Sequence, residues 1–174
     1  MTTITTITTT RVALFLAIAL AISVQTFAQS QITTFILVRH AERGEDGTKD
    51  PDISEDGKKR ANRLAEMLSK TSIAAIYSTT YKRTRNTVAP LANAKGLEVL
   101  PYEPLKGESI DKMLLDHAGK TVVISGHSNT IPWTANYLTG NNELKDFADN
   151  DYTNFLVVSV LKKGTSTNLT WLTY

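Results

Sequence analysis

The stretch FILVRHAERGEDG, from Phe35 to Gly47, joins an apolar run to a charged pair and a polar, glycine-containing segment. Ile32 to Val38 is short, β-branched, aromatic and nearly all apolar at its end, which predicts a buried β-strand. Arg39 and His40 follow directly. In open α/β sheets, ligands bind beyond the carboxyl ends of the strands. The stretch therefore predicts a central strand that places a guanidinium and an imidazole where a ligand binds.

The segments after this strand alternate between apolar runs and amphipathic stretches. Helices are expected from Ser54, a capping residue, to Leu68, and over residues 81–96, 110–117 and 129–140. Further strands are expected at residues 73–78, 97–103 and 121–125, and a closing hairpin of strands at residues 154–162 and 167–174. This alternation predicts an α/β fold with helices on both faces of a sheet. The continuous apolar strands indicate a mainly parallel sheet, and the hairpin indicates an antiparallel edge.

The composition limits the class of protein. With 174 residues, 41% of them hydrophobic and 21% charged, the chain is long enough for one globular domain. The formal charge is only +2 and the sequence has no basic stripe, so no nucleic-acid partner is expected. The absence of cysteine excludes disulfides, thiolate metal sites and cysteine nucleophiles.

Residues 1–28 are expected to form a signal peptide. A threonine-rich start with Arg11 as its only charge precedes VALFLAIALAISV, whose length matches a signal-peptide hydrophobic region. The small residues Thr26 and Ala28 predict cleavage after Ala28, which leaves a single domain at residues 29–174. The apolar stretch is short for a membrane span of about 20 residues, and an uncleaved N-terminal membrane anchor is the alternative. With the lack of cysteine, this indicates export to a bacterial periplasm or the exterior, without stable membrane insertion after cleavage.

Two of the three histidines fall after predicted strands. His40 follows the first, and His127 follows the fourth in SGHSNT, residues 125–130, while the second strand ends in STTYKRTR, residues 78–85. Arginine matches phosphate oxygens with a planar fork, and helix N-termini add backbone donors. A neutral imidazole is a nucleophile, and a second histidine can donate to a phosphoryl oxygen. The set predicts a phosphoryl site that needs no metal, with a carboxylic acid nearby to protonate the leaving group.

Simpler interpretations of these residues remain open. An Arg-His pair after a strand is often part of a solvated rim. A metal site on His40 and His127 is conceivable because imidazole is a common ligand, although the adjacent arginine opposes a cation and no HxH or HExxH spacing occurs. His117, late in a short predicted helix, is expected to be a surface residue that interacts with the helix dipole.

Four segments resemble the motifs of one protein family. RHAE after the first strand, DPDISEDGKKRANRLAEML at the first helix, STTYKRTRNT after the second strand, and GHSNT resemble those of the histidine phosphatase, or phosphoglycerate mutase-like, superfamily. The resemblance spans residues 35 to about 140 and implies a three-layer α/β/α sandwich. It implies that His40 is the nucleophile, that Arg39 and Arg83 bind phosphate, and that His127 is the second histidine of the pocket.

The sequence departs from that family's pattern at three points. RHA replaces the commoner RHG, and GHS replaces GHG, so that Ser128 adds a hydroxyl near the phosphate or caps the helix. The general acid is unmarked: Glu103 in PYEPLKGE is the nearest positional match, and Glu108 is the second choice, with first-turn helix stabilisation as its other role. Glu42, two residues after the expected nucleophile, is a further candidate for the substrate pocket.

The residues and the resemblance together predict an exported, metal-independent phosphatase that hydrolyses phosphomonoesters through a phosphohistidine on His40, without a cofactor. Short loops predict an open site, which suits a small-molecule or glycolipid phosphomonoester. A sugar-phosphate mutase and a phosphohistidine protein phosphatase use the same intermediate and remain alternatives. A non-catalytic module that binds a phosphate ligand is the alternative from another class of function.

Overall fold

Strand β1 (Thr33–Arg39) lies inside a six-stranded sheet, between β4 (Thr121–Gly126) and β5 (Asn154–Lys162). The computed structural model describes residues 31–174, so the predicted signal peptide at residues 1–28 lies outside the described residues. The strand order is β3-β2-β4-β1-β5-β6, completed by β2 (Ala75–Ser78), β3 (Val99–Pro101) and β6 (Ser166–Thr173). The pairs among β1 to β4 are parallel, and the hairpin of β5 and β6 forms the antiparallel edge. The predicted α/β sheet with a mixed edge is confirmed.

Both faces of β1 are buried. Successive side chains of a strand point to opposite faces of the sheet. Phe35 and Leu37 accordingly belong to one core, and Ile36 and Val38 belong to another, each with no more than 4% of its surface exposed. This double burial is why the strand is a continuous apolar run rather than an alternating one.

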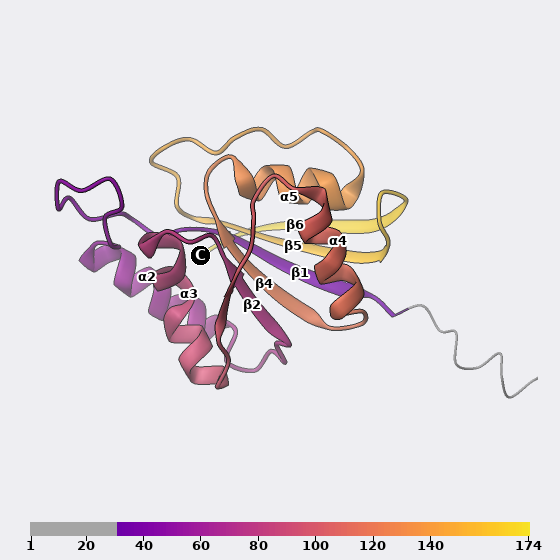
Figure 1. The fold of residues 1–174 in the computed structure, drawn as a ribbon, viewed down its shortest axis with the longest axis horizontal. Helices are drawn as coiled ribbons and strands as arrows, with labels where there is room; N and C mark the ends of the chain where they lie inside the picture. The colour runs from indigo at the N-terminus through magenta and orange to yellow at the C-terminus, as the bar shows by residue number, and fades with distance from the viewer. Residues whose placement is uncertain (1–30) are drawn as a thin grey trace, which may run out of the picture. The chain divides into compact units, whose positions relative to one another are not determined.

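Two helices cover each face of the sheet, which gives the predicted three layers (Figure 1). On the side of Ile36 lie α2 (Glu55–Met67) and α3 (Lys82–Lys95), which contribute Leu64 and Leu91 to that core. The core on the side of Phe35 is built from α4 (Gly107–Asp116) and α5 (Thr130–Thr139). Their buried side chains in that core are Ile110, Met113, Ile131, Ala135 and Leu138.

Local signals in the sequence set several helix ends. The Ser54 hydroxyl accepts a hydrogen bond of 3.1 Å from the Gly57 amide and caps α2, as predicted. Gly140 ends α5 with a φ of 76°, and a Cβ there would lie 2.6 Å from the Gly164 Cα in the β5–β6 turn. Only glycine supplies both the left-handed conformation and this close approach.

Two elements differ from the predicted bounds. The third strand was expected over residues 97–103 but covers only Val99–Pro101, because it pairs only with the short strand β2, at Ile76 to Ser78. Helix α4 begins at Gly107 rather than Ile110 and ends at Asp116, with His117 as its C-cap. His117 is also not a free surface side chain, because its Nε2 lies 3.0 Å from the Tyr77 hydroxyl.

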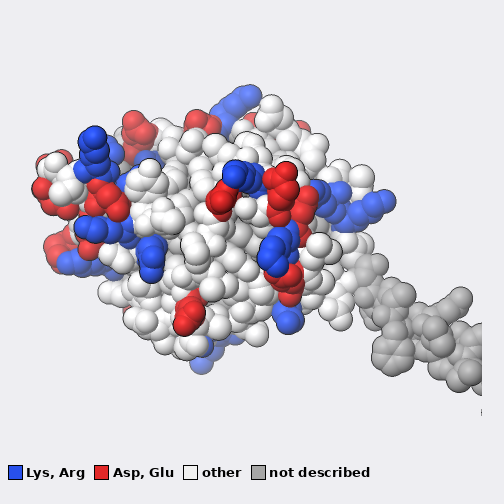
Figure 2. Space-filling model, viewed as in Figure 1, with Lys and Arg blue, Asp and Glu red and all other residues white. Residues whose placement is uncertain are grey.

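Charged side chains of both signs are mixed on the surface. Figure 2 shows them gathered over the loop before α2 and the start of that helix, and again around α4. Paired charges occur in both places, such as Lys58 with Glu55 and Lys112 with Asp116, each at 2.7 to 2.8 Å. Between residues 31 and 174, no helix has the length and apolar character needed to cross a membrane.

Candidate active site

The predicted phosphate-binding residues meet in a cavity of about 420 Å³ at the carboxyl ends of β1, β2 and β4. Arg39 at the end of β1 pairs in register with Gly126 at the end of β4. The next residues along the two strands, His40 and His127, therefore leave the sheet side by side, with ring centroids 5.4 Å apart. The cavity is lined by Arg39, His40, Arg43, Tyr81, Arg83, Pro104, Leu105, His127, Ser128, Asn129, Thr130 and Asp149.

The imidazole of His40 is held as a neutral base. It is 5% exposed, and its Nδ1 lies 2.8 Å from the Ala41 carbonyl oxygen, which can only accept a hydrogen bond. Nδ1 therefore carries the proton, and Nε2 keeps its lone pair. Burial lowers the pKa of His40 from 6.5 to about 3; the bond to Ala41 opposes this, and the charge of Arg83 adds to it. At neutral pH, Nε2 is thus available as a nucleophile.

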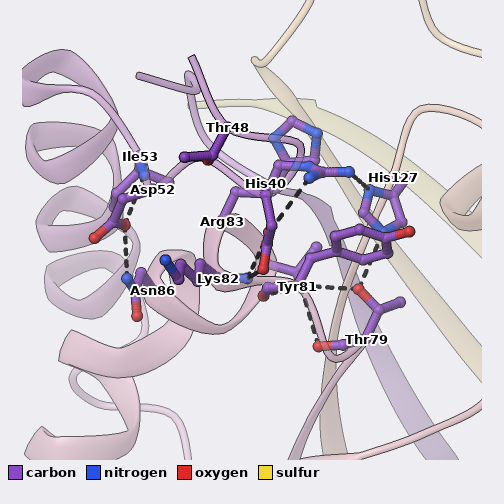
Figure 3. Close-up of polar contacts among 12 residues, drawn as sticks. His40, Thr48, Asp52, Ile53, Thr79, Tyr81, Lys82, Arg83, Asn86 and His127 are labelled. Atoms are coloured by element: carbon purple, nitrogen blue, oxygen red, sulfur yellow. Dashed lines mark hydrogen bonds and ion pairs between the residues drawn. The ribbon is translucent and has the colours of Figure 1, made fainter. Parts of the chain in front are cut away.

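His127 is oriented by a chain of hydroxyl groups. Its Nδ1 lies 3.4 Å from Arg83 Nη2, which only donates, so that the proton resides on Nε2. Nε2 donates to the Thr79 hydroxyl at 3.0 Å (Figure 3). The Thr79 hydroxyl in turn lies 2.8 Å from the Thr84 hydroxyl. The Thr84 hydroxyl donates to the Tyr81 carbonyl oxygen at 2.8 Å. Burial, followed by the charge of Arg83, lowers the pKa of His127 to about 4. The chain fixes the tautomer as well as the direction of the ring.

Thr79→Val is expected to lower kcat/KM about 10-fold or more, because His127 loses the acceptor that orients it. The loss of one buried hydrogen bond should cost about 1 kcal/mol of stability. Thr79→Ser keeps the hydroxyl and should restore most of the rate. The exposed neighbour offers a matched control, Thr80→Val, which should leave kcat/KM unchanged. Equal rates for Thr79→Val and wild type, with phosphate release as the measurement, would show that the hydroxyl chain does not orient His127.

Arg83 is a cation of the cavity that lies beside His127. It projects from the first turn of α3 with its guanidinium carbon 4.3 Å from the centre of the Tyr81 ring. Its Nη1 lies 3.7 Å from an Asp50 oxygen, and the same carboxylate accepts from the Lys82 amide at 3.1 Å. Figure 3 shows Arg83 directed toward His127 from the helix. The guanidinium lines the cavity together with both histidines, and its binding of a phosphoryl group stays a prediction.

Arg39 lines the cavity and also binds the backbone of a loop. Its Nη1 donates to the carbonyl oxygens of Ala148 and Asp151 at 2.6 and 2.8 Å, and its Nη2 donates to that of Asp149 at 2.9 Å. The guanidinium carbon also lies 4.4 Å from the centre of the Tyr152 ring. The buried Nε has no hydrogen-bond partner among the described residues. Arg39 therefore holds the loop of residues 148–151 beside His40, and these three bonds do not use its buried Nε–H.

The three glutamates proposed from the sequence lie outside the lining of this cavity. Glu42 forms an ion pair with Arg60, with its oxygens 2.6 to 3.0 Å from the guanidinium nitrogens, and lines another cavity. Glu103 pairs with Lys106 and lines a neighbouring cavity of about 490 Å³. Glu108 lies in the first turn of α4, the position expected for its alternative role of stabilising the start of the helix. Ser128 does line the site.

Several residues of the site were not predicted from the sequence. Thr79 and Tyr81 directly follow β2, so the rule that ligands bind beyond strand ends could have indicated them. Asp149 and Tyr152 come from the long loop between α5 and β5, and nothing in their local sequence indicates the site. Among residues 31–174, no group of three or more histidine, cysteine, aspartate or glutamate side chains is arranged to hold a metal ion.

The low pKa of His40 predicts that the stability of the folded protein depends on pH. The unfolded chain takes up a proton near pH 6.5, whereas the folded protein resists it until about pH 3, so stability is lost as the pH falls through this window. His40 alone should reduce the free energy of unfolding by about 3 kcal/mol between pH 7 and pH 4. Urea unfolding at the two pH values should show the reduction in wild type and a correspondingly smaller one in His40→Asn. The same reduction in both proteins would contradict the assignment.

The fold and the site together define an α/β/α sandwich protein with a cavity lined by two histidines at adjacent ends of parallel strands. The model of the histidine phosphatase superfamily (branch 1) matches residues 35–107, which include His40 and Arg83. Over these residues the chain is similar to the histidine phosphatase superfamily, which agrees with the resemblance of its motifs.

Comparisons with individual proteins agree with this similarity. Phosphoserine phosphatase 1 of Hydrogenobacter thermophilus is 48% identical over 71 residues, which cover 37% of this chain and 34% of that protein. The match thus spans about a third of the length of that relative. A mycobacterial glucosyl-3-phosphoglycerate phosphatase superposes with a TM-score of 0.66 at 13% identity, covering 83% of this chain and 99% of that one. A phosphoserine phosphatase from Entamoeba histolytica, in complex with phosphoserine, superposes with a TM-score of 0.62 at 15% identity. That match covers 79% of this chain and 95% of the other. These two structures share the fold.

Proposed function

We propose that this protein is a phosphatase that hydrolyses phosphomonoesters through a phosphohistidine on His40. One observation carries the proposal: His40 is a buried neutral imidazole whose unprotonated Nε2 lies in a cavity together with His127 and Arg83. A neutral imidazole beside a cation suits attack on an anionic ester, because the cation attracts the phosphoryl group while the nucleophile keeps its lone pair.

The geometry supports a two-step reaction. His40 Nε2 forms a bond to phosphorus as the bond between phosphorus and the alcohol oxygen breaks, and the alcohol leaves with a proton. Water then breaks the phosphorus–nitrogen bond, which releases inorganic phosphate and regenerates His40. The Arg83 guanidinium stabilises the negative charge on the phosphoryl oxygens in both steps. A bound phosphoryl dianion also raises the pKa of His127, which favours a proton on Nδ1 that can be donated to a phosphoryl oxygen.

The substrate we propose is a small phosphomonoester. The cavity of about 420 Å³ suits such a molecule, and Tyr81, Leu105 and Asn129 offer apolar and amide contacts for its alcohol part. The similarity to phosphoserine phosphatase 1 supports the ester of a primary alcohol. Metal independence and export belong to the same proposal; the arginines supply the positive charge, and the apolar segment within residues 1–28 supports export.

A panel of phosphoesters tests this function. The purified protein should release phosphate from p-nitrophenyl phosphate and from at least one of phosphoserine and the sugar phosphates, equally with and without EDTA. Loss of activity in EDTA would contradict the metal-free mechanism. A folded protein that binds phosphate but releases none from any ester would instead be a binding module, and transfer of phosphate between sugars without release would indicate a mutase. Export is tested by whether residues 1–28 direct a fused reporter out of a bacterial cell.

A further inference from the structure

The direction of attack decides where a proton donor must stand. In an in-line displacement, the leaving oxygen lies on the side of phosphorus opposite the nucleophile. His40 is only 5% exposed, so its Nε2 approaches phosphorus from the inner end of the cavity and the leaving oxygen points toward the mouth. An alkoxide is a poor leaving group and requires a proton as its bond to phosphorus breaks. The acid is therefore expected among the residues at the mouth of the cavity.

Only one carboxylate is available among the described residues that line this cavity. Glu103 and Glu108 lie outside the lining, and Glu103 is paired with Lys106. Asp50 lies near Arg83, and both of its oxygens accept from the Lys82 amide at the start of α3, so they are already in use. Asp149 lines the cavity and is exposed to solvent, as expected of a residue at the mouth.

The backbone that carries Asp149 is fixed next to His40. Arg39 donates three hydrogen bonds to the carbonyl oxygens of Ala148, Asp149 and Asp151. The amide of the buried Phe147 donates to the Ser128 carbonyl oxygen at 3.0 Å, which ties the same loop to the segment that carries His127. The backbone of the loop is thus attached to the ends of both strands that supply the histidines, which keeps Asp149 beside them.

We propose that Asp149 is the proton donor of the reaction, an inference that rests on the proposed function. The protonated carboxyl group donates to the leaving oxygen while the bond from phosphorus to that oxygen breaks and the bond from phosphorus to His40 Nε2 forms. The resulting carboxylate then accepts a proton from the water that attacks the phosphohistidine, and the carboxyl group is restored as inorganic phosphate leaves. No further reactant is needed.

The test is the dependence of the rate on the leaving group. A missing acid slows the release of poor leaving groups much more than that of good ones. For Asp149→Asn, we expect kcat/KM to fall about 10²-fold or more for phosphoserine or phenyl phosphate, but less than about 3-fold for p-nitrophenyl phosphate. Asp149→Glu should recover part of the loss. Asp146→Asn is the matched control, because Asp146 is exposed on the same loop and does not line the cavity.

The outcomes separate this inference from the proposed function. Equal losses on good and poor leaving groups would show that Asp149 only supports the loop, and would overturn the proposal. So would a leaving-group-dependent loss in Glu103→Gln or Glu108→Gln with none in Asp149→Asn. A folded wild-type protein that releases phosphate from no ester would refute the proposed function and with it any proton donor, a result that is visible before any variant is made.

Discussion

His40→Asn is expected to lower kcat by about 10³-fold or more, because the reaction loses the atom that attacks phosphorus. An asparagine amide can still donate to the Ala41 carbonyl oxygen, as His40 Nδ1 does at 2.8 Å, so the corner after β1 should keep its conformation. Steady-state phosphate release measures the loss. Circular dichroism of the variant checks that the fold is retained.

The covalent intermediate gives a second measurement on the same variant. Wild-type protein quenched during turnover of a labelled ester should carry label that is stable to base and labile to acid, and His40→Asn should carry none. His117→Asn is the matched control, since His117 ends α4 and contacts the Tyr77 hydroxyl at 3.0 Å, away from the cavity. Label that persists in His40→Asn, or disappears in His117→Asn, would place the nucleophile elsewhere.

Arg83→Gln is expected to lower kcat/KM by about 10²- to 10³-fold, which corresponds to about 3–4 kcal/mol of transition-state stabilisation. Arg39 has already committed three hydrogen bonds to loop carbonyl oxygens, whereas the Arg83 guanidinium contacts His127 inside the cavity. The substitution removes the charge that attracts the phosphoryl group and stabilises it during transfer. The ratio of kcat/KM for variant and wild type on one ester measures the effect.

The same substitution should shift the titration of both histidines. The positive charge of Arg83 lowers the pKa of His40 and of His127, so its removal raises both values. NMR titration of the imidazole resonances would detect the change, and Arg85→Gln, an exposed arginine of the same helix, should produce no shift. An Arg83→Gln protein that loses no more activity than Arg85→Gln would show that Arg83 does not bind the phosphoryl group.

The positions of the two histidines could be predicted because they depend on strand ends. His40 and His127 each follow an apolar run, and parallel strands that lie next to each other bring their carboxyl ends to one edge of the sheet. Arg83 could be placed for a similar reason, as it lies in the first turn of the helix after β2. These positions can be predicted from the hydrophobic pattern of each strand and from the rule that ligands bind at the carboxyl ends of parallel strands.

The carboxylates could not be predicted in the same way. Glu42 lies two residues from His40, yet its side chain is directed to Arg60 on α2, which is decided by how the helix packs on the sheet. Glu103 was chosen by its position in the chain, but β3 is short and the segment after it turns the carboxylate toward Lys106. The distance between two residues in the sequence says little about direction once the chain leaves a strand.

The sequence by itself determined the two-sided core around β1 and the meeting of two histidines at the sheet edge, since both follow from local periodicity and from strand ends. Only the tertiary structure decided the role of Arg39 and the position of Asp149. Arg39 and the carbonyl oxygen of Ala148 are 109 residues apart in the chain, and the hydrogen bond between them depends on the path of an irregular loop. The low pKa values of His40 and His127 were also set at this level, because burial and the charge of Arg83 arise only when distant segments pack together.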